Sequence, residues 1–220
     1  KQSLFKLNQK LYQFLVFLLT FKNILYIFFY VLKVIFMLVL NLMGEPSVGK
    51  SSTAGGVFYE LGVRGYKSEI ITEVAKGFAW ETPIHPKTGE TFAHPIFGQQ
   101  IYLLGEQNRL LERVLGKRQV AIMECPLIMT AIYQPDNYFK NFTPLVLEQF
   151  NVYNNFNILL ERNHSFDNEG RVHNESESLH VRNKLKDFLK EHSIPYITLK
   201  THPDINKEIA SLVIDKLVQK

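Results

Sequence analysis

Short apolar runs alternate along residues 37–220 with longer stretches in which apolar side chains recur at helical spacing. The apolar runs predict strands at Met37–Met43, Ser68–Thr72, Gln119–Glu124, Asn157–Glu161 and Pro195–Leu199. The remaining periodic stretches predict helices at Lys50–Leu61, Val74–Trp80, Ile96–Leu115, Pro144–Val152, Glu175–His192 and Asp204–Val218. Because strands and helices alternate, we expect an α/β fold, a three-layer sandwich with a parallel sheet and helices on both faces.

The first 36 residues form a hydrophobic leader with a different pattern. Leu11–Leu32 is mostly apolar, is interrupted by Lys22 and Asn23, and approaches the ~20 residues that span a bilayer. The chain begins with Lys1, whereas Met37 stands at the start of the first predicted strand. Three interpretations remain open: a non-native leader translated upstream of the true start, a membrane helix or anchor, and a packed helix. The boundary therefore falls between 1–36 and a domain at 37–220.

Composition suits one α/β domain, because 220 residues with 46% hydrophobic residues can bury a single core. The net charge of +4 comes from residues 1–36, which hold five Lys and no acid; the body is left with 20 basic and 21 acidic residues. A uniformly basic face for nucleic acid is therefore not indicated. The single Cys125 excludes an internal disulfide and fits a reducing compartment. We expect a cytoplasmic protein, with a membrane tether through residues 11–32 as the alternative.

Residues 44–51 read Gly-Glu-Pro-Ser-Val-Gly-Lys-Ser, which is a complete G-x-x-x-x-G-K-[ST] phosphate-binding loop between a predicted strand and a predicted helix. Its glycines let successive N–H groups face a phosphate, Lys50 reaches the β/γ oxygens, and the Ser51 hydroxyl coordinates Mg²⁺. The predicted cofactors are therefore ATP and Mg²⁺. The nucleotide-binding residues are expected to be Gly44, Glu45, Pro46, Ser47, Val48, Gly49, Lys50, Ser51 and Ser52.

Two acidic residues stand at equivalent ends of predicted strands. Glu124 follows Val-Ala-Ile-Met and is predicted to coordinate Mg²⁺ together with Ser51. Glu73 ends the second predicted strand, and we expect it to act as the general base or to bind the acceptor hydroxyl. Exchange of these two roles remains open, and so does a plain exposed carboxylate at each strand end.

Two long loops have the composition of functional segments. The polar loop Arg162–Asn174 fits a closing lid in which Arg162 and Arg171 hold the transferring phosphoryl group; a solvated loop with surface ion pairs is the alternative. The loop Glu81–Pro95 fits an insertion on the substrate side. Amides within Ile96–Leu115, among them Gln100 and Gln107, predict either recognition of a base or acceptor or a solvated helix face.

Four of these features together resemble the AAA_28 group of small P-loop ATPases and kinases, which includes nicotinamide riboside kinase-like domains and many phage-encoded proteins. They are the phosphate loop, Glu73, the run Ile122–Tyr133 and the segment Arg162…Arg171, and the likeness extends over about residues 37–200. The resemblance implies a kinase-type strand order of 2-3-1-4-5. It also implies ATP/Mg²⁺-dependent phosphorylation of a nucleoside-like acceptor. Glu124-Cys125-Pro126 departs from the Asp-Ser-Pro or Asp-Arg of relatives, which weakens transfer of the detailed metal geometry.

The leading hypothesis is a P-loop kinase that moves the ATP γ-phosphate to a hydroxyl of a nucleoside, nucleotide or related small molecule. One alternative is a kinase of a modified base in DNA, which the near-neutral body disfavours. The other is an ATP-binding switch whose slow hydrolysis drives partner binding. The sequence does not identify the acceptor or the oligomeric state.

Overall fold

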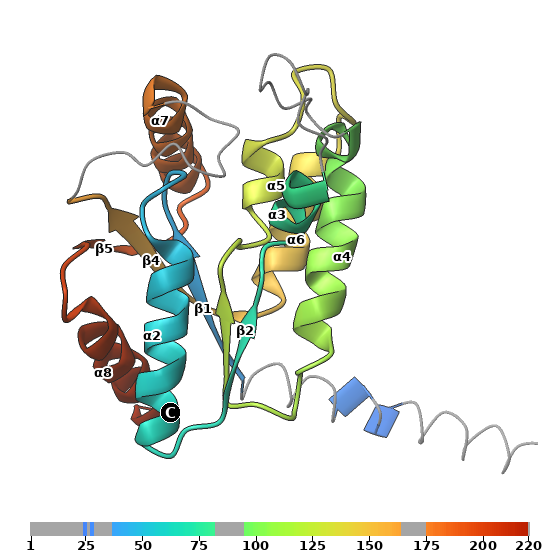
Figure 1. Ribbon diagram of the computed structural model, residues 1–220. Helices are drawn as coiled ribbons and strands as arrows, with labels where there is room; N and C mark the ends of the chain where they lie inside the picture. The colour runs from blue at the N-terminus through green and yellow to red at the C-terminus, as the bar shows by residue number, and fades with distance from the viewer. Residues whose placement is uncertain (1–23, 26, 29–36, 82–94, 164–174, 220) are drawn as a thin grey trace, which may run out of the picture.

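The computed structural model of this chain describes residues 24–25, 27–28, 37–81, 95–163 and 175–219 (Figure 1). Most of the leader, most of the loop 81–95 and residues 164–174 lie outside these ranges, so the predictions made for them stay predictions. Ile24, Leu25, Ile27 and Phe28 are helical and exposed. Among the described residues, no helix has both the length and the apolar character needed to cross a membrane.

The strands are β1 Leu38–Met43, β2 Ser68–Ile71, β3 Val120–Met123, β4 Asn154–Glu161 and β5 Ile197–Lys200. The α-helices described after residue 37 are α2 Lys50–Val63, α3 Val74–Glu81, α4 Gln100–Glu112, α5 Met129–Ile132, α6 Phe142–Asn151, α7 Glu175–Glu191 and α8 Ile205–Val218, with a 3₁₀ turn η1 at Pro95–Gly98. Each strand and helix predicted from the pattern is present, with shifted ends.

The strands form one parallel sheet in the order β2-β3-β1-β4-β5. This is the order that the resemblance implied, and it is confirmed. β1 is central, between β3 and β4, so the loop that follows it opens at the middle of the carboxyl edge. Ligands of open α/β sheets bind at this edge.

Alternate residues of the buried strands supply two separate cores, because successive side chains in a strand point to opposite faces. Leu38, Leu40 and Leu42 of β1 pack with α2 and α8 on one face of the sheet. Val39 and Met43 pack on the other face with α4, α5, α6 and α7. Figure 1 shows α2 and α8 on one side of the sheet and α4 and α6 on the other. The chain is a three-layer α/β sandwich.

Three asparagines, of which Asn41 and Asn157 are buried and Asn155 is half-buried, interrupt the apolar pattern between β1 and β4. The Asn41 amide donates to the side-chain oxygens of Asn155 at 2.8 Å and of Asn157 at 2.9 Å. Asn155 in turn donates to the carbonyls of Phe150 and Tyr153, and Asn157 donates to the carbonyl of Pro195. Buried amides are tolerated here because each finds partners.

Two differences from the sequence prediction are larger than a shift of one or two residues at an end. β4 begins at Asn154 and not at Asn157, because Asn155 and Asn157 satisfy their amides across the sheet and thereby extend the strand. The predicted helix at Ile96–Leu115 is divided into η1 and α4, and the single turn α5 was not predicted.

Candidate functional site

The phosphate loop joins β1 to α2 and requires unusual backbone angles. Gly44 has a φ of 146° and Gly49 has a φ of 91°, a region that favours glycine. A Cβ on Gly44 would meet the Leu160 carbonyl oxygen and the Val48 side chain, each at 2.9 Å, so close approach to β4 also demands glycine there. Ser47 adopts a φ of 63° without being glycine. Strained backbone of this kind gathers at ligand-binding loops.

Lys50 lies across the inside of this loop. Its ammonium group donates to the carbonyl oxygens of Gly44 and Glu45, each at 3.1 Å. Lys50 is also the first residue of α2, so the positive end of the helix dipole and the first free N–H groups lie beside its ammonium group. The loop therefore concentrates positive charge and donors where a polyphosphate binds.

Glu73 and Glu124 follow the adjacent strands β2 and β3, which pair in register through Ile71 and Met123. The Glu124 residue is 8% exposed, and its N–H donates to the Ile71 carbonyl at 3.1 Å. The predicted proximity of these two acids is consistent with the sheet register.

The pKa of the Cys125 thiol depends on the charged groups of the site. Although Cys125 keeps some solvent contact, protein atoms crowd its thiol, and this burial raises the pKa of the thiol well above 9.0. The negative charges of Glu73 and, more weakly, Glu124 raise it further, whereas the Lys50 ammonium opposes them. Burial, with Cys125 and Glu73 nearby, likewise raises the pKa of the Tyr133 hydroxyl. The structure therefore brings both acids and the phosphate-loop lysine to one locality.

Lys76 is a site residue that the sequence interpretation missed. Its ammonium donates to the Ser51 hydroxyl at 3.0 Å. Lys76 lies in the first turn of α3, where the helix dipole disfavours a cation. That misplaced charge, three residues after Glu73, was a signal available in the sequence.

The Gln107 side chain fixes the turn between β2 and α3. This buried amide accepts from the Val74 N–H at 3.1 Å and donates to the Thr72 carbonyl at 3.0 Å, on either side of Glu73. The Gln100 amide donates to the Phe97 carbonyl at 2.8 Å. Both glutamines are therefore engaged with the main chain, which matches neither the ligand-reading role nor the solvated face considered for them.

Glu45 carries a fully buried carboxylate inside the phosphate loop. Its oxygens lie 3.8 Å from Arg162 Nε and 3.7 Å from Arg182 Nε. Arg162, at the end of β4, is thus beside the loop as the lid hypothesis requires. Arg171 lies outside the described residues, so its role stays a prediction. Arg182, on α7, was not predicted.

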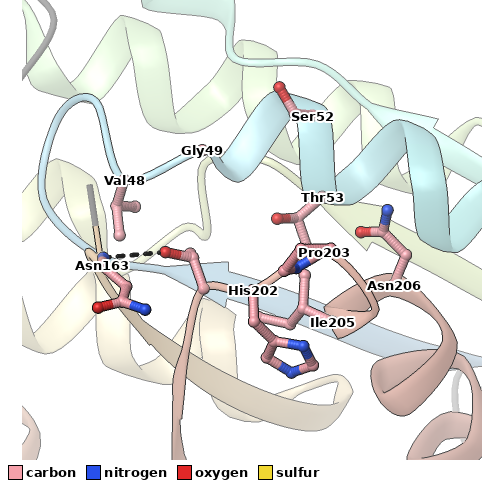
Figure 2. Close-up of a pocket in the computed structure, with 10 residues that line it drawn as sticks. Val48, Gly49, Ser52, Thr53, Asn163, His202, Pro203, Ile205 and Asn206 are labelled. Atoms are coloured by element: carbon pink, nitrogen blue, oxygen red, sulfur yellow. Dashed lines mark hydrogen bonds between the residues drawn. The ribbon is translucent and has the colours of Figure 1, made fainter. Parts of the chain in front are cut away.

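A pocket of about 440 Å³ opens beside the start of α2. Figure 2 shows its walls: Val48, Gly49, Ser52 and Thr53 from the loop and helix, Asn163 after β4, and His202, Pro203, Ile205 and Asn206 before and within α8. The Asn163 N–H donates to the Thr201 hydroxyl at 3.1 Å, which ties the last two walls together. The wall formed by residues 201–206 was not predicted.

Oxygen donors dominate the candidate metal position. Among residues that the structure describes, no cluster of three His, Cys, Asp or Glu side chains could hold a metal. The Ser51 hydroxyl and the Glu124 carboxylate nevertheless suit Mg²⁺, which prefers oxygen ligands and keeps several waters and phosphate oxygens. The residues present therefore fit magnesium that enters with a nucleotide.

Comparison with known proteins gives a family match and similar folds. The AAA_28 family, described as an AAA domain, matches residues 39–204. The crystal structure of a NadR protein in complex with NAD and AMP-PNP is similar at a TM-score of 0.61 and 13% identity, covering 84% of this chain and 50% of that chain. The match thus spans half of the NadR chain and shows a shared fold.

A deoxyadenosine kinase from M. mycoides, solved with the products dCMP and a flexible dCDP, gives a TM-score of 0.47 at 16% identity. That alignment covers 83% of this chain and 100% of the kinase chain. No curated protein matches this sequence at a significant level.

Proposed function

Because this chain belongs to the AAA_28 family, we propose that it is an ATP- and Mg²⁺-dependent phosphotransferase. In this proposal it moves the γ-phosphate to a hydroxyl of a nucleoside, nucleotide or related small molecule. The observation that carries the proposal is the phosphate loop at the middle of the carboxyl edge, with Lys50 bonded inside it and with Glu73 and Glu124 following the adjacent strands β2 and β3. Nucleotide binding alone requires the lysine but not a second acid, whereas phosphoryl transfer needs a group that orients the acceptor.

In this proposal the phosphate loop binds the phosphates of the nucleotide, and the adjoining pocket binds its base. The loop N–H groups and Lys50 would bind the β- and γ-phosphates. The pocket beside Ser52 and Thr53 adjoins the loop on the side of Asn163 and Asn206, and its volume suits a purine base and part of its ribose. The proposed donor is therefore ATP.

Ser51 and Glu124 would hold the magnesium ion, directly or through water. Bound Mg²⁺ supplies charge neutralisation at the phosphates. Glu73, on the neighbouring strand end, would accept the proton of the acceptor hydroxyl, and Gln107 holds the backbone on both sides of it. Exchange of roles between Glu73 and Glu124 is tested below.

Arginine completes the charge balance. Phosphoryl transfer is accelerated by positive groups around the transferring phosphate, and guanidinium groups bind its oxygens in pairs. Arg162 is proposed for this role because it lies next to the carboxylate of Glu45, a residue of the phosphate loop. Arg171 is proposed with it on the family resemblance alone. The proposed location is the cytoplasm, where ATP is available.

The first experiment is transfer from γ-labelled ATP by the full chain with Mg²⁺. The acceptors are nucleosides, nucleotides, nicotinamide riboside and DNA with a modified base, and the controls are Lys50→Ala and the exposed Lys67→Ala. We expect one small-molecule acceptor to be labelled, and Lys50→Ala to lower turnover by at least about 10²-fold, as loss of one charge-stabilising donor does.

The outcomes separate the three functions. Labelling of a small molecule supports the proposal and names the acceptor. Labelling of DNA alone would assign the modified-base kinase. ATP binding with no labelled acceptor would overturn phosphotransfer in favour of an ATP-binding switch, and equal turnover by Lys50→Ala would contradict the nucleotide role itself.

A further inference from the structure

One face of α7 rests against the phosphate loop. Ser178, Arg182 and Lys186 follow each other at intervals of four residues and so share one side of the helix. The Ser178 hydroxyl donates to the Pro46 carbonyl at 3.0 Å, and Lys186 bonds to Glu161 at the end of β4 at 2.8 Å. Figure 1 shows α7 beside the loop that follows β1.

A second face of the same helix anchors it in the core. Val181, Leu185 and Leu189 are buried in the core on the face of the sheet that α4, α5 and α6 also cover. The position of α7 is therefore fixed by apolar packing on one side and by polar contacts with the loop on the other. Arg182 lies in the middle of the polar face, so the packing of α7 also fixes the place of its backbone.

Glu45 has the wrong sign for direct contact with phosphate. A fully buried carboxylate inside an anion-binding loop repels the ligand and is costly to desolvate. Neither of its oxygens makes a hydrogen bond among the described residues, and its buried charge is balanced by Arg162 at 3.8 Å and Arg182 at 3.7 Å. Its position is explained if its task is to hold guanidinium groups at the loop.

The ion pair leaves Arg182 able to bind a further anion. The separation of 3.7 Å exceeds hydrogen-bond distance, and Arg182 Nε is buried without a hydrogen-bond partner among the described residues. The Arg182 side chain is 28% exposed, against 9% for Arg162, so part of it is open to solvent. Buried donors normally have a hydrogen-bond partner, so an unpartnered donor beside an anion-binding loop is explained by a ligand that binds there.

We propose that Arg182 binds the phosphoryl group that is transferred, and that Glu45 is a positioning residue that holds Arg182 at the phosphate loop. The inference rests on the proposed phosphotransfer function. A guanidinium group donates two parallel hydrogen bonds to phosphate oxygens, a geometry that lysine cannot reproduce. Arg182 adds to the positive charge that Lys50 and Arg162 bring to the loop, against the one carboxylate of Glu45.

The test is the affinity of the full chain for AMP-PNP and for ADP, each with Mg²⁺, measured by calorimetry. Arg182→Gln is expected to weaken AMP-PNP binding by about ten- to a hundredfold, the effect of one lost charge-assisted contact, and to leave ADP binding within about threefold. Arg182→Lys should recover only part of the preference. The control is Lys186→Gln, one turn further on the same face, which should leave the ratio of the two affinities unchanged.

Glu45→Gln tests the positioning role, because it removes the charge and keeps the shape. We expect the preference for AMP-PNP to fall in Glu45→Gln when Arg182 is present, and to change little more when Glu45→Gln is added to Arg182→Gln. Additive effects in this double-mutant cycle would overturn the coupling of the two residues.

The outcomes for the inference and for the proposed function differ. Wild-type protein that binds both nucleotides, with an unchanged affinity ratio in Arg182→Gln, would overturn the inference and leave phosphotransfer intact. Wild-type protein that binds neither nucleotide would overturn both. If Arg182→Gln fails to fold, Arg182→Lys keeps a cation beside Glu45, and an affinity ratio equal to that of wild type would then contradict bidentate binding.

Discussion

The Lys76 ammonium donates a hydrogen bond to the Ser51 hydroxyl at 3.0 Å, so a cation lies beside the oxygen that is proposed to bind magnesium. Two cations on one hydroxyl repel each other. Magnesium can therefore reach Ser51 only if the Lys76 ammonium moves away or the metal is held at higher free energy.

Replacement of Lys76 by methionine should remove this competition. We expect Lys76→Met to lower the Mg²⁺ concentration at half-maximal ATP turnover severalfold, because the Ser51 oxygen becomes available without displacement of a charge. The exposed Lys67→Met serves as the control and should leave this concentration unchanged. A higher Mg²⁺ requirement in Lys76→Met would contradict competition and would assign Lys76 to the phosphates.

The two strand-end acids are distinguished by their dependence on metal and on acceptor. Glu124→Gln should raise the Mg²⁺ concentration at half-maximal turnover, because an amide oxygen is a weaker ligand than a carboxylate. Glu73→Gln should lower kcat for acceptor phosphorylation by about 10²–10⁴-fold with an unchanged Mg²⁺ requirement, because general bases contribute that much. Steady-state kinetics at varied Mg²⁺ measures both. The reverse pattern would exchange the two roles.

Neighbouring glycines of α2 offer a matched test of the pocket. A methyl group on Gly56 would overlap the Asn206 side chain, whereas one on Gly55 would meet no atom within 4 Å. Because Asn206 lines the pocket, Gly56→Ala should raise KM for ATP severalfold. Gly55→Ala should leave KM unchanged and stabilise the helix by about 0.5–1 kcal/mol. Equal KM values for the two variants would place the nucleotide base elsewhere.

The contact between Lys186 and Glu161 should make part of the stability depend on pH. The hydrogen bond from Lys186 holds the pKa of the Glu161 carboxyl below 4.5. A carboxyl whose pKa is lower in the folded state stabilises the fold above its unfolded pKa, and this contribution is lost as the pH falls through the folded pKa.

Lys186→Gln should therefore lower the free energy of unfolding by about 0.2–1 kcal/mol at neutral pH, the range for partly exposed ion pairs. The difference from wild type should shrink below pH 4.5 and disappear once the pH is below the lowered pKa of Glu161. Urea unfolding at both pH values measures it, with the exposed Lys184→Gln as the control on the same helix. A difference that persists in acid would assign the effect to packing of the lysine stem.

The apolar runs were sufficient to locate the strands, because β1, β3 and the second half of β4 are mostly apolar and buried. The start of β4 could not be predicted in this way. Asparagine is a poor strand former, and the partners of Asn155 lie on β1, in the last turn of α6 and in the turn after it, which the local sequence does not reveal. α5 was missed because a single turn has no periodicity.

In the candidate site, too, the sequence predicted the local features and missed those that depend on the tertiary fold. Residues 44–51 form a local motif, and Glu73 and Glu124 end local strands, so their positions followed from chain order and sheet topology. Arg182 looked like an ordinary charged residue on a surface helix, since its partner Glu45 lies far away in sequence. The pocket wall at residues 201–206 resembled a plain helix start, because only the tertiary fold brings it to α2.

The asparagine amides between β1 and β4 fix the register of the two strands that lead into the candidate site. β1 runs directly into the loop that holds Glu45, and β4 ends one residue before Arg162. A shift of one residue in the pairing of these strands would leave the Asn41 amide without its partners in an apolar layer. It would also move Arg162 by about 3.3 Å along the sheet and place its side chain on the opposite face. The pairing register that the asparagines fix thus sets the distance between Glu45 and Arg162.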